Sequence, residues 1–272
     1  MTDIDPLLLG ACAGVGAGAG FLGGLLGIGG GVVIVPALLL LFEWQGFPTA
    51  TAAPVAVATS LATIIATSIS AARAQIRRGS VDWAIVRAWT PALLVGSLAS
   101  GPIADRLPET VLPWFIGLFL LAVAAIMLAA WQPAPHRRLP GGPAGLALGG
   151  GAGLLSGLAG IGGGNVIVPT LVFFNVPMRL AAGTSSTLGF PIAVAGTTGF
   201  VLAGLDQPDL PPGTFGYVHV AAALSMAALS FAVAPLGVAL AHRIPAARLK
   251  RLFGVLLAVV SARVLWSALQ SL

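Results

Sequence analysis

The chain has 272 residues, of which 57% are hydrophobic and only 8% charged, and its net charge is +5. A soluble domain carries about 25% charged residues, so this composition indicates an integral membrane protein. No stretch alternates apolar and polar residues over ~10 positions, which argues against an outer-membrane barrel. The basic residues lie in short clusters between apolar segments, a pattern typical of membrane topology rather than of nucleic-acid binding.

Eight apolar segments follow one another along the chain. A single membrane span needs ~20 residues, so six of the segments fit one helix each, whereas the first and fifth are too long. The acidic N-terminus lacks the basic region of a cleavable signal peptide, so the first segment is expected to stay in the mature protein. The predicted segments are Leu7–Phe42, Ala50–Ala72, Trp83–Ile103, Thr110–Trp131, Ala144–Phe174, Leu180–Leu205, Phe215–Leu240 and Leu252–Leu269.

The two long segments are each interrupted by the same glycine cluster. Gly27-Ile-Gly-Gly-Gly31 leads to Pro36, and Gly160-Ile-Gly-Gly-Gly164 leads to Pro169, at an offset of 133 residues. Each glycine costs a helix about 1 kcal/mol relative to alanine, so the chain is expected to break there. The match predicts an internal duplication, with a first membrane repeat over residues 1–131, a cytoplasmic linker over 132–143 and a second repeat over 144–272.

The basic residues decide how the repeats lie in the membrane. If all eight segments crossed once, seven basic residues would face one side and six the other, which is no positive-inside pattern. If the first and fifth segments are hairpins that return to their own side, 11 of the 13 basic residues gather on one side. This arrangement predicts inverted repeats, with both termini outside the cytoplasm. The gathered residues are Arg73, Arg77, Arg78, Arg87, Arg137, Arg138, Arg179, Arg243, Arg248, Lys250 and Arg251.

The hairpin tips are the candidate binding site. The helix that leaves each tip begins with unpaired N–H groups and the positive end of its dipole, which attract an anion, and glycine lets a ligand approach the backbone closely. Repeated hydroxyl residues in the following helix could add donors, although such hydroxyls commonly bond to their own helix. The predicted substrate-binding residues are Gly29, Gly30, Gly31, Thr59, Ser60, Gly162, Gly163, Gly164, Asn165, Thr184 and Ser185.

His219 is the one titratable group of note inside an apolar segment. It could relay a proton or contact the substrate, or it could be a packed histidine at the membrane interface. Intramembrane proteolysis or metal chemistry would need a cluster of His, Asp, Glu or Cys residues. Because His219 stands alone, we expect neither an enzyme, nor a metal, nor a cofactor.

At this point the chain resembles the TauE/SafE sulfite-exporter family over nearly its whole length. The doubled Gly-Ile-Gly-Gly-Gly-x-x-x-x-Pro motif carries the resemblance, together with the Thr-Ser elements at 58–60 and 183–185. Further matching stretches are Arg77–Trp83, Gly216-Tyr217-Val218 and Ala234–Pro245. The resemblance implies an all-α permease of the bacterial inner membrane that exports small sulfur-containing anions such as sulfite, sulfoacetate or other organosulfonates.

The chain departs from the family pattern in two places. His219 stands after Gly216-Tyr217-Val218, where we expect an uncharged polar residue such as asparagine. The first repeat also has four more residues than the second between its proline (Pro48 or Pro177) and its Thr-Ser element. The coupling chemistry is therefore open, and the two halves of the site need not be symmetric.

The sequence thus predicts a multi-pass transporter that works by alternating access. An anion channel or uncoupled facilitator, a carrier of small non-sulfur carboxylates, and an accessory membrane protein without a substrate are the alternatives. The expected partners are a small anionic substrate and the lipid bilayer, but no nucleic acid, and association as a homodimer stays open.

Overall fold

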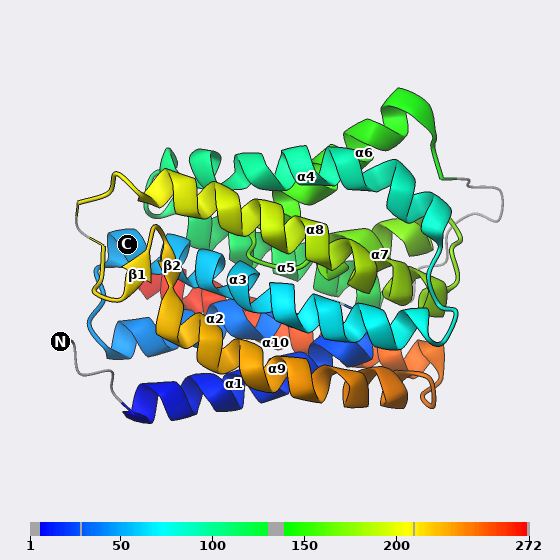
Figure 1. Cartoon of the computed structure of the whole chain (residues 1–272), viewed down its shortest axis with the longest axis horizontal. Coiled ribbons are helices and arrows are strands. Elements are labelled where there is room, and N and C mark those ends of the chain that lie inside the picture. Colours follow the sequence, from blue (N-terminus) through cyan, green and yellow to red (C-terminus); the bar gives the residue numbers. More distant parts are fainter. Residues whose placement is uncertain (1–5, 28, 130–138, 209, 271–272) are drawn as a thin grey trace.

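The computed structural model describes residues 6–27, 29–129, 139–208 and 210–270 and is almost entirely helical. The predicted linker 132–143 lies mostly outside these described residues. The helices lie roughly along one long axis, side by side (Figure 1). They are α1 (Pro6–Leu26), α2 (Gly31–Trp44), α3 (Thr49–Ile76), α4 (Trp83–Asp105), α5 (Val111–Leu128), α6 (Gly142–Leu158), α7 (Gly164–Phe173), α8 (Met178–Gly204), α9 (Val220–Ala241) and α10 (Ala246–Gln270).

Four of the described helices are long and apolar enough to cross a membrane, namely α1, α3, α8 and α9. Helices α2, α5, α7 and α10 contribute shorter apolar stretches. The interior mixes large and small side chains, and among the described residues α3 holds a run of fully buried Val and Ala residues from Val55 to Ala58. Small residues allow the close helix–helix contact on which packing in a membrane depends.

Each glycine cluster turns the chain back on itself. Helix α1 starts at the left end of the molecule in this view and α2 returns to that end, while α6 and α7 form a second hairpin from the opposite end (Figure 1). The turn in the first hairpin is tight, because a Cβ on Gly30 would lie 2.5 Å from the carbonyl oxygen of Ala19. Gly30 and Gly163 begin the outgoing helices in the left-handed region, with φ of 83° and 82°, which only glycine adopts readily.

The first limb of each hairpin packs against a helix far away in the sequence. Glycines at four-residue spacing form each contact face, as in the small-xxx-small packing of membrane helices. In α1, Gly16, Gly20 and Gly24 face Met226, Ser230 and Ala234 of α9; in α6, Gly149 faces Trp89 and Ala92 of α4, Gly153 faces Leu93, and Gly157 faces Ser97 and Ser100. In both contacts the residue numbers increase in the same direction along the two helices, so the helices of each pair run parallel.

The expectation of one helix over Phe215–Leu240 is wrong at its beginning. Strand β1 (Thr214–Phe215) pairs antiparallel with β2 (Val218–His219), and α9 begins only at Val220. Gly213 and Gly216 take positive φ values of 83° and 52°, which favours a tight turn over a helix. The predicted boundaries elsewhere differ by a few residues, most of all for α10, which begins at Ala246 rather than at Leu252.

Charge separates along the long axis. At one end, the guanidinium of Arg179 donates to the carbonyl of His242 at 3.3 Å, and the His242 ring contacts the Gln75 amide oxygen at 3.2 Å. The end of α3, the start of α8 and the end of α9 therefore meet there. Glu43, Asp105 and Asp206 belong to the opposite end, where α2, α4 and α8 terminate (Figure 1).

Candidate functional site

The two glycine tips touch each other inside the molecule. A Cβ on Gly29 would lie 3.4 Å from the Cα of Gly162, and one on Gly31 would collide with the carbonyl oxygen of Gly160. No side chain larger than hydrogen fits at Gly31 without a shift. The first and second tips, Gly29–Gly31 and Gly160–Gly164, therefore form one backbone-lined region between the hairpins.

The starts of α2 and α7 lack side-chain caps. Their N-cap residues are Gly30 and Gly163, so no side chain accepts the first N–H groups of either helix. The glycine carbonyls accept only from later residues, for example from Val33 and Val166 at 3.0 and 3.1 Å. Uncapped N–H groups at a helix start carry partial positive charge and can bind an anion.

Ser60 and its repeat counterpart Ser185 differ in their hydrogen bonding. The Ser60 hydroxyl donates to the carbonyl oxygen of Gly160 at 2.8 Å and so ties α3 to the second tip. The Ser185 hydroxyl is fully buried and has no partner within the described part of the chain. The same residue type is thus structural in one repeat and unpaired in the other.

Asn165 is the second residue of α7 and is 1% exposed. Neither its amide nitrogen nor its amide oxygen has a hydrogen-bond partner among the residues that the structure describes. At the matching position of the first tip stands Val32, which is also buried. A buried amide without a protein partner is uncommon and calls for an explanation, such as a role in function or a bond to water or an ion.

Thr59 and Thr184 already have partners. The Thr59 hydroxyl accepts the backbone N–H of His219 at 3.0 Å, and the Thr184 hydroxyl accepts the backbone N–H of Asp82 at 2.9 Å. Each bond joins a helix of one predicted repeat to the start of a helix in the other. Both threonines therefore hold helices together in this structure, and their predicted contact with a substrate stays a prediction.

His219 caps the start of α9. Its Nδ1 accepts the backbone N–H of Ala222 at 3.3 Å, and its ring lies beside the stacked rings of Phe42 and Phe47, about 6 Å from each centroid. Asp82 caps α4 in the same way, by accepting from Ala84 and Ile85. The structure thus gives His219 a structural role, and a role in proton transfer stays a prediction.

Ser68 lies at the second tip although the sequence did not suggest it. Its hydroxyl is buried and unpaired among the described residues, and a Cβ on Gly189 would lie 2.8 Å from it and 2.8 Å from the carbonyl oxygen of Gly162. The available signal was a run of hydroxyl residues in α3 that includes Thr63, Thr67 and Ser70. Those three bond to carbonyls or to Ser230, so only the structure separates Ser68 from them.

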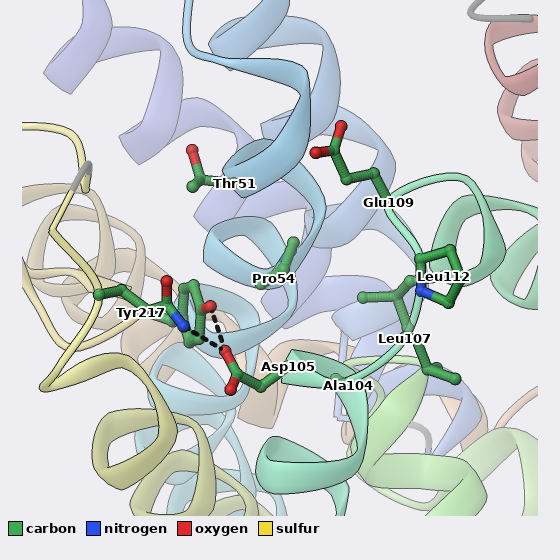
Figure 2. Close-up of a pocket in the computed structure, with 10 residues that line it drawn as sticks. Thr51, Pro54, Ala104, Asp105, Leu107, Glu109, Leu112 and Tyr217 are labelled. Carbon is green, nitrogen blue, oxygen red and sulfur yellow. Dashed lines mark hydrogen bonds between the residues drawn. The ribbon is translucent and has the colours of Figure 1, made fainter.

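A pocket of about 370 Å³ opens at the acidic end of the molecule (Figure 2). One carboxylate oxygen of Asp105 accepts from the Tyr217 hydroxyl at 2.6 Å and from the Gln207 amide at 3.0 Å. Burial, and then the Asp105 carboxylate, raise the pKa of Tyr217 far above its ordinary value. The phenol therefore stays a donor and ties the β1–β2 turn to the end of α4. The pocket is lined by Thr51, Pro54, Ala104, Asp105, Leu107, Pro108, Glu109, Leu112, Gln207 and Tyr217.

Comparison with known proteins gives one consistent match. The family described as "Sulfite exporter TauE/SafE" matches residues 12–264. The chain is 32% identical over 251 residues to a probable membrane transporter protein of Haemophilus influenzae, an alignment that covers 92% of this chain and 95% of the relative. It is 29% identical over 252 residues to a probable membrane transporter protein of Methanocaldococcus jannaschii, covering 90% and 91%. No solved structure matches.

Proposed function

The chain belongs to the TauE/SafE sulfite exporter family of membrane transporters, which are not enzymes, and we propose that it carries small sulfur-containing anions across the bacterial inner membrane. Sulfite, sulfoacetate and other organosulfonates are the proposed substrates. The observation that carries the proposal is the contact between Gly29 and Gly162, which brings the uncapped starts of α2 and α7 to one region. Two helix dipoles that converge on a region without cations favour a small anion.

The proposed site holds the anion with neutral donors. Backbone N–H groups come from Gly29–Gly31, Gly162 and Gly164, because the N–H of Gly163 already donates to the carbonyl of Ile161 at 2.6 Å; hydroxyl and amide groups come from Ser185 and Asn165. Both of these side chains are buried without a partner in the described residues, so a bound oxyanion would accept from their donor groups. Ser60 would position the second tip through its bond to Gly160.

The proposed mechanism is alternating access between two inverted repeats. The support is the matched packing of α1 on α9 and of α6 on α4, in which each glycine pairs with a residue of the other predicted repeat. Corresponding residues lie at a constant offset of 133 in α1 and α6 and of 137 in α9 and α4. Two bodies, each built from the hairpin of one repeat and helices of the other, could rotate against each other around a fixed site at the membrane midplane.

In the proposed orientation the end that carries Arg77, Arg78 and Arg179 faces the cytoplasm, and both termini lie outside it. The support is the excess of arginine at that end, because basic residues in short loops stay cytoplasmic. A membrane potential that is negative inside then favours anion efflux by about 2.3 kcal/mol per charge per 100 mV. Export needs no coupling ion on this account, whereas import would need one.

A ligand screen on the purified protein tests the substrate. We expect sulfite, thiosulfate or sulfoacetate, but not acetate or malonate, to raise the thermal unfolding temperature. Ser185→Ala should reduce that shift, whereas Ser225→Ala should leave it unchanged, because the Ser225 hydroxyl bonds to Ala222 within its own helix. A shift by the carboxylates alone would replace the sulfur anion with a carboxylate as the substrate.

Flux measurements in vesicles test the mode of transport. A carrier shows saturation and counterflow, whereas a channel shows flux that is linear in voltage and no counterflow. If no small anion binds or moves, and bulky replacements of Gly163 and Ser185 change no transport phenotype, the proposal fails and an accessory membrane role remains.

A further inference from the structure

The second tip carries unpaired polar groups that the first tip lacks. Ser68 is 1% exposed, and its hydroxyl and the carbonyl oxygen of Gly162 both flank Gly189, each 2.8 Å from a Cβ built on that glycine. Ser68 nevertheless bonds to no described residue. Asn165, the second residue of α7, likewise has no described partner for either of its amide atoms.

The corresponding positions at the first tip are apolar. Ile64 occupies the place in α3 that Gly189 has in α8, and its side chain packs on the first tip, 3.1 Å from a Cβ on Gly29. Val32 stands where the second tip has Asn165 and is buried. The two tips therefore differ chemically, and the unpaired side chains of Ser68 and Asn165 belong to the second.

These unsatisfied groups include both donors and an acceptor. The hydroxyl of Ser68 and the amide nitrogen of Asn165 can donate. The amide oxygen of Asn165 can only accept. A simple oxyanion offers acceptors alone, so it would leave the acceptor of Asn165 buried and unpaired.

The geometry points to a second tip that selects small oxyanions carrying a hydrogen-bond donor beside their acceptor oxygens. The donor of the ligand binds Asn165 Oδ1, and its oxygens accept from Ser68 and from the start of α7. This inference rests on the proposed anion site and names its ligand class. A site built to bond a donor rejects the analogue that lacks it, because its own buried acceptor is then left unpaired.

Sulfamate and methanesulfonate test the inference, because they are monoanions of nearly equal shape that differ only in having an NH2 or a CH3 group on the sulfonate. Binding of each to the purified full chain is measured by titration in detergent. We expect sulfamate to bind at least tenfold more tightly. Equal affinity, or tighter binding of methanesulfonate, overturns the inference but leaves the proposed anion site standing. Binding of neither anion, together with no response to sulfite or sulfoacetate, overturns both.

Two variants separate acceptor from donor. Asn165→Val, which copies the first tip, should remove most of the preference for sulfamate. Ser68→Ala removes only a donor, so it should weaken the binding of both anions by a similar factor. The ratio of the two affinities should therefore stay the same. If Asn165→Val retains the full ratio, the acceptor is not Asn165 and the inference fails. Should Asn165→Val not fold, the ratio of the affinities for sulfamate and methanesulfonate, measured in the wild type and in Ser68→Ala, still tests the inference.

Discussion

The hydroxyl oxygen of Thr59 accepts the backbone N–H of His219 at 3.0 Å, so α3 is tied to the residue that immediately precedes α9. Thr184 of α8 does the same for the residue before α4, where it accepts the backbone N–H of Asp82 over 2.9 Å. Each of these two helices thus secures the start of a helix in the other predicted repeat. The pair of bonds links the halves independently of the glycine tips.

Replacing Thr59 by valine should destabilise the protein. The change keeps the volume but leaves the N–H of His219 buried without its acceptor, which costs about 1–3 kcal/mol. We expect a lower thermal unfolding temperature in detergent for Thr59→Val and a similar loss for Thr184→Val. Thr198→Val is the control, because that hydroxyl is exposed and bonds to Val194 in its own helix. Equal stability of all three variants would show that the two bonds contribute nothing.

Gly20 and Gly18 offer a matched test of the helix contact between α1 and α9. A Cβ on Gly20 would lie 2.5 Å from the Cα of Ser230, so Gly20→Ala must push the helices apart, at a cost of about 1–3 kcal/mol. A Cβ on Gly18 meets nothing within 4 Å, so Gly18→Ala should stabilise the helix slightly. Thermal unfolding of the two variants measures the difference, and a destabilised Gly18→Ala would contradict this packing.

The chain contains a single tyrosine, so the absorbance of tyrosinate reports Tyr217 alone. Because burial and Asp105 raise the pKa of Tyr217, its titration should begin well above the ordinary pKa of 10.0. The folded state holds this proton more tightly than the unfolded state, so stability falls as the pH rises above the ordinary value. Asp105→Asn should lower the pKa of Tyr217, and an unchanged titration would argue against the bond between them.

The membrane orientation can be read from cysteine labelling in intact cells. Cys12 is buried, and Cys12→Ala gives a clean background for single introduced cysteines. Arg78→Cys and Glu109→Cys place a thiol at exposed positions on the basic and the acidic end. An impermeant maleimide should label Glu109→Cys before lysis and Arg78→Cys only afterwards. The reverse order would invert the proposed topology.

The sequence predicts the features that are set by neighbouring residues better than those that depend on contacts between distant segments. The glycine tips and most helices follow from composition and spacing, because glycine clusters break helices and apolar segments form them. The contact of Gly20 with Ser230, and the lack of a described hydrogen-bond partner for the Ser68 hydroxyl, depend on how distant segments pack together. Residue types alone could not separate the unpaired Ser185 from Ser60, since only the structure shows that Ser60 reaches the carbonyl of Gly160.

His219→Asn separates a capping role from proton transfer. Asparagine caps helices well, so it can replace the Nδ1 that accepts from Ala222 at 3.3 Å, but it cannot carry a proton at physiological pH. We expect His219→Asn to keep both stability and the pH profile of transport, whereas His219→Leu should lose about 1 kcal/mol of stability with the cap. The measurements are thermal unfolding and anion flux across a pH series. If His219→Asn folds normally but its flux no longer varies with pH as in the parent chain, the ring takes part in proton coupling and its capping bond is incidental to that role.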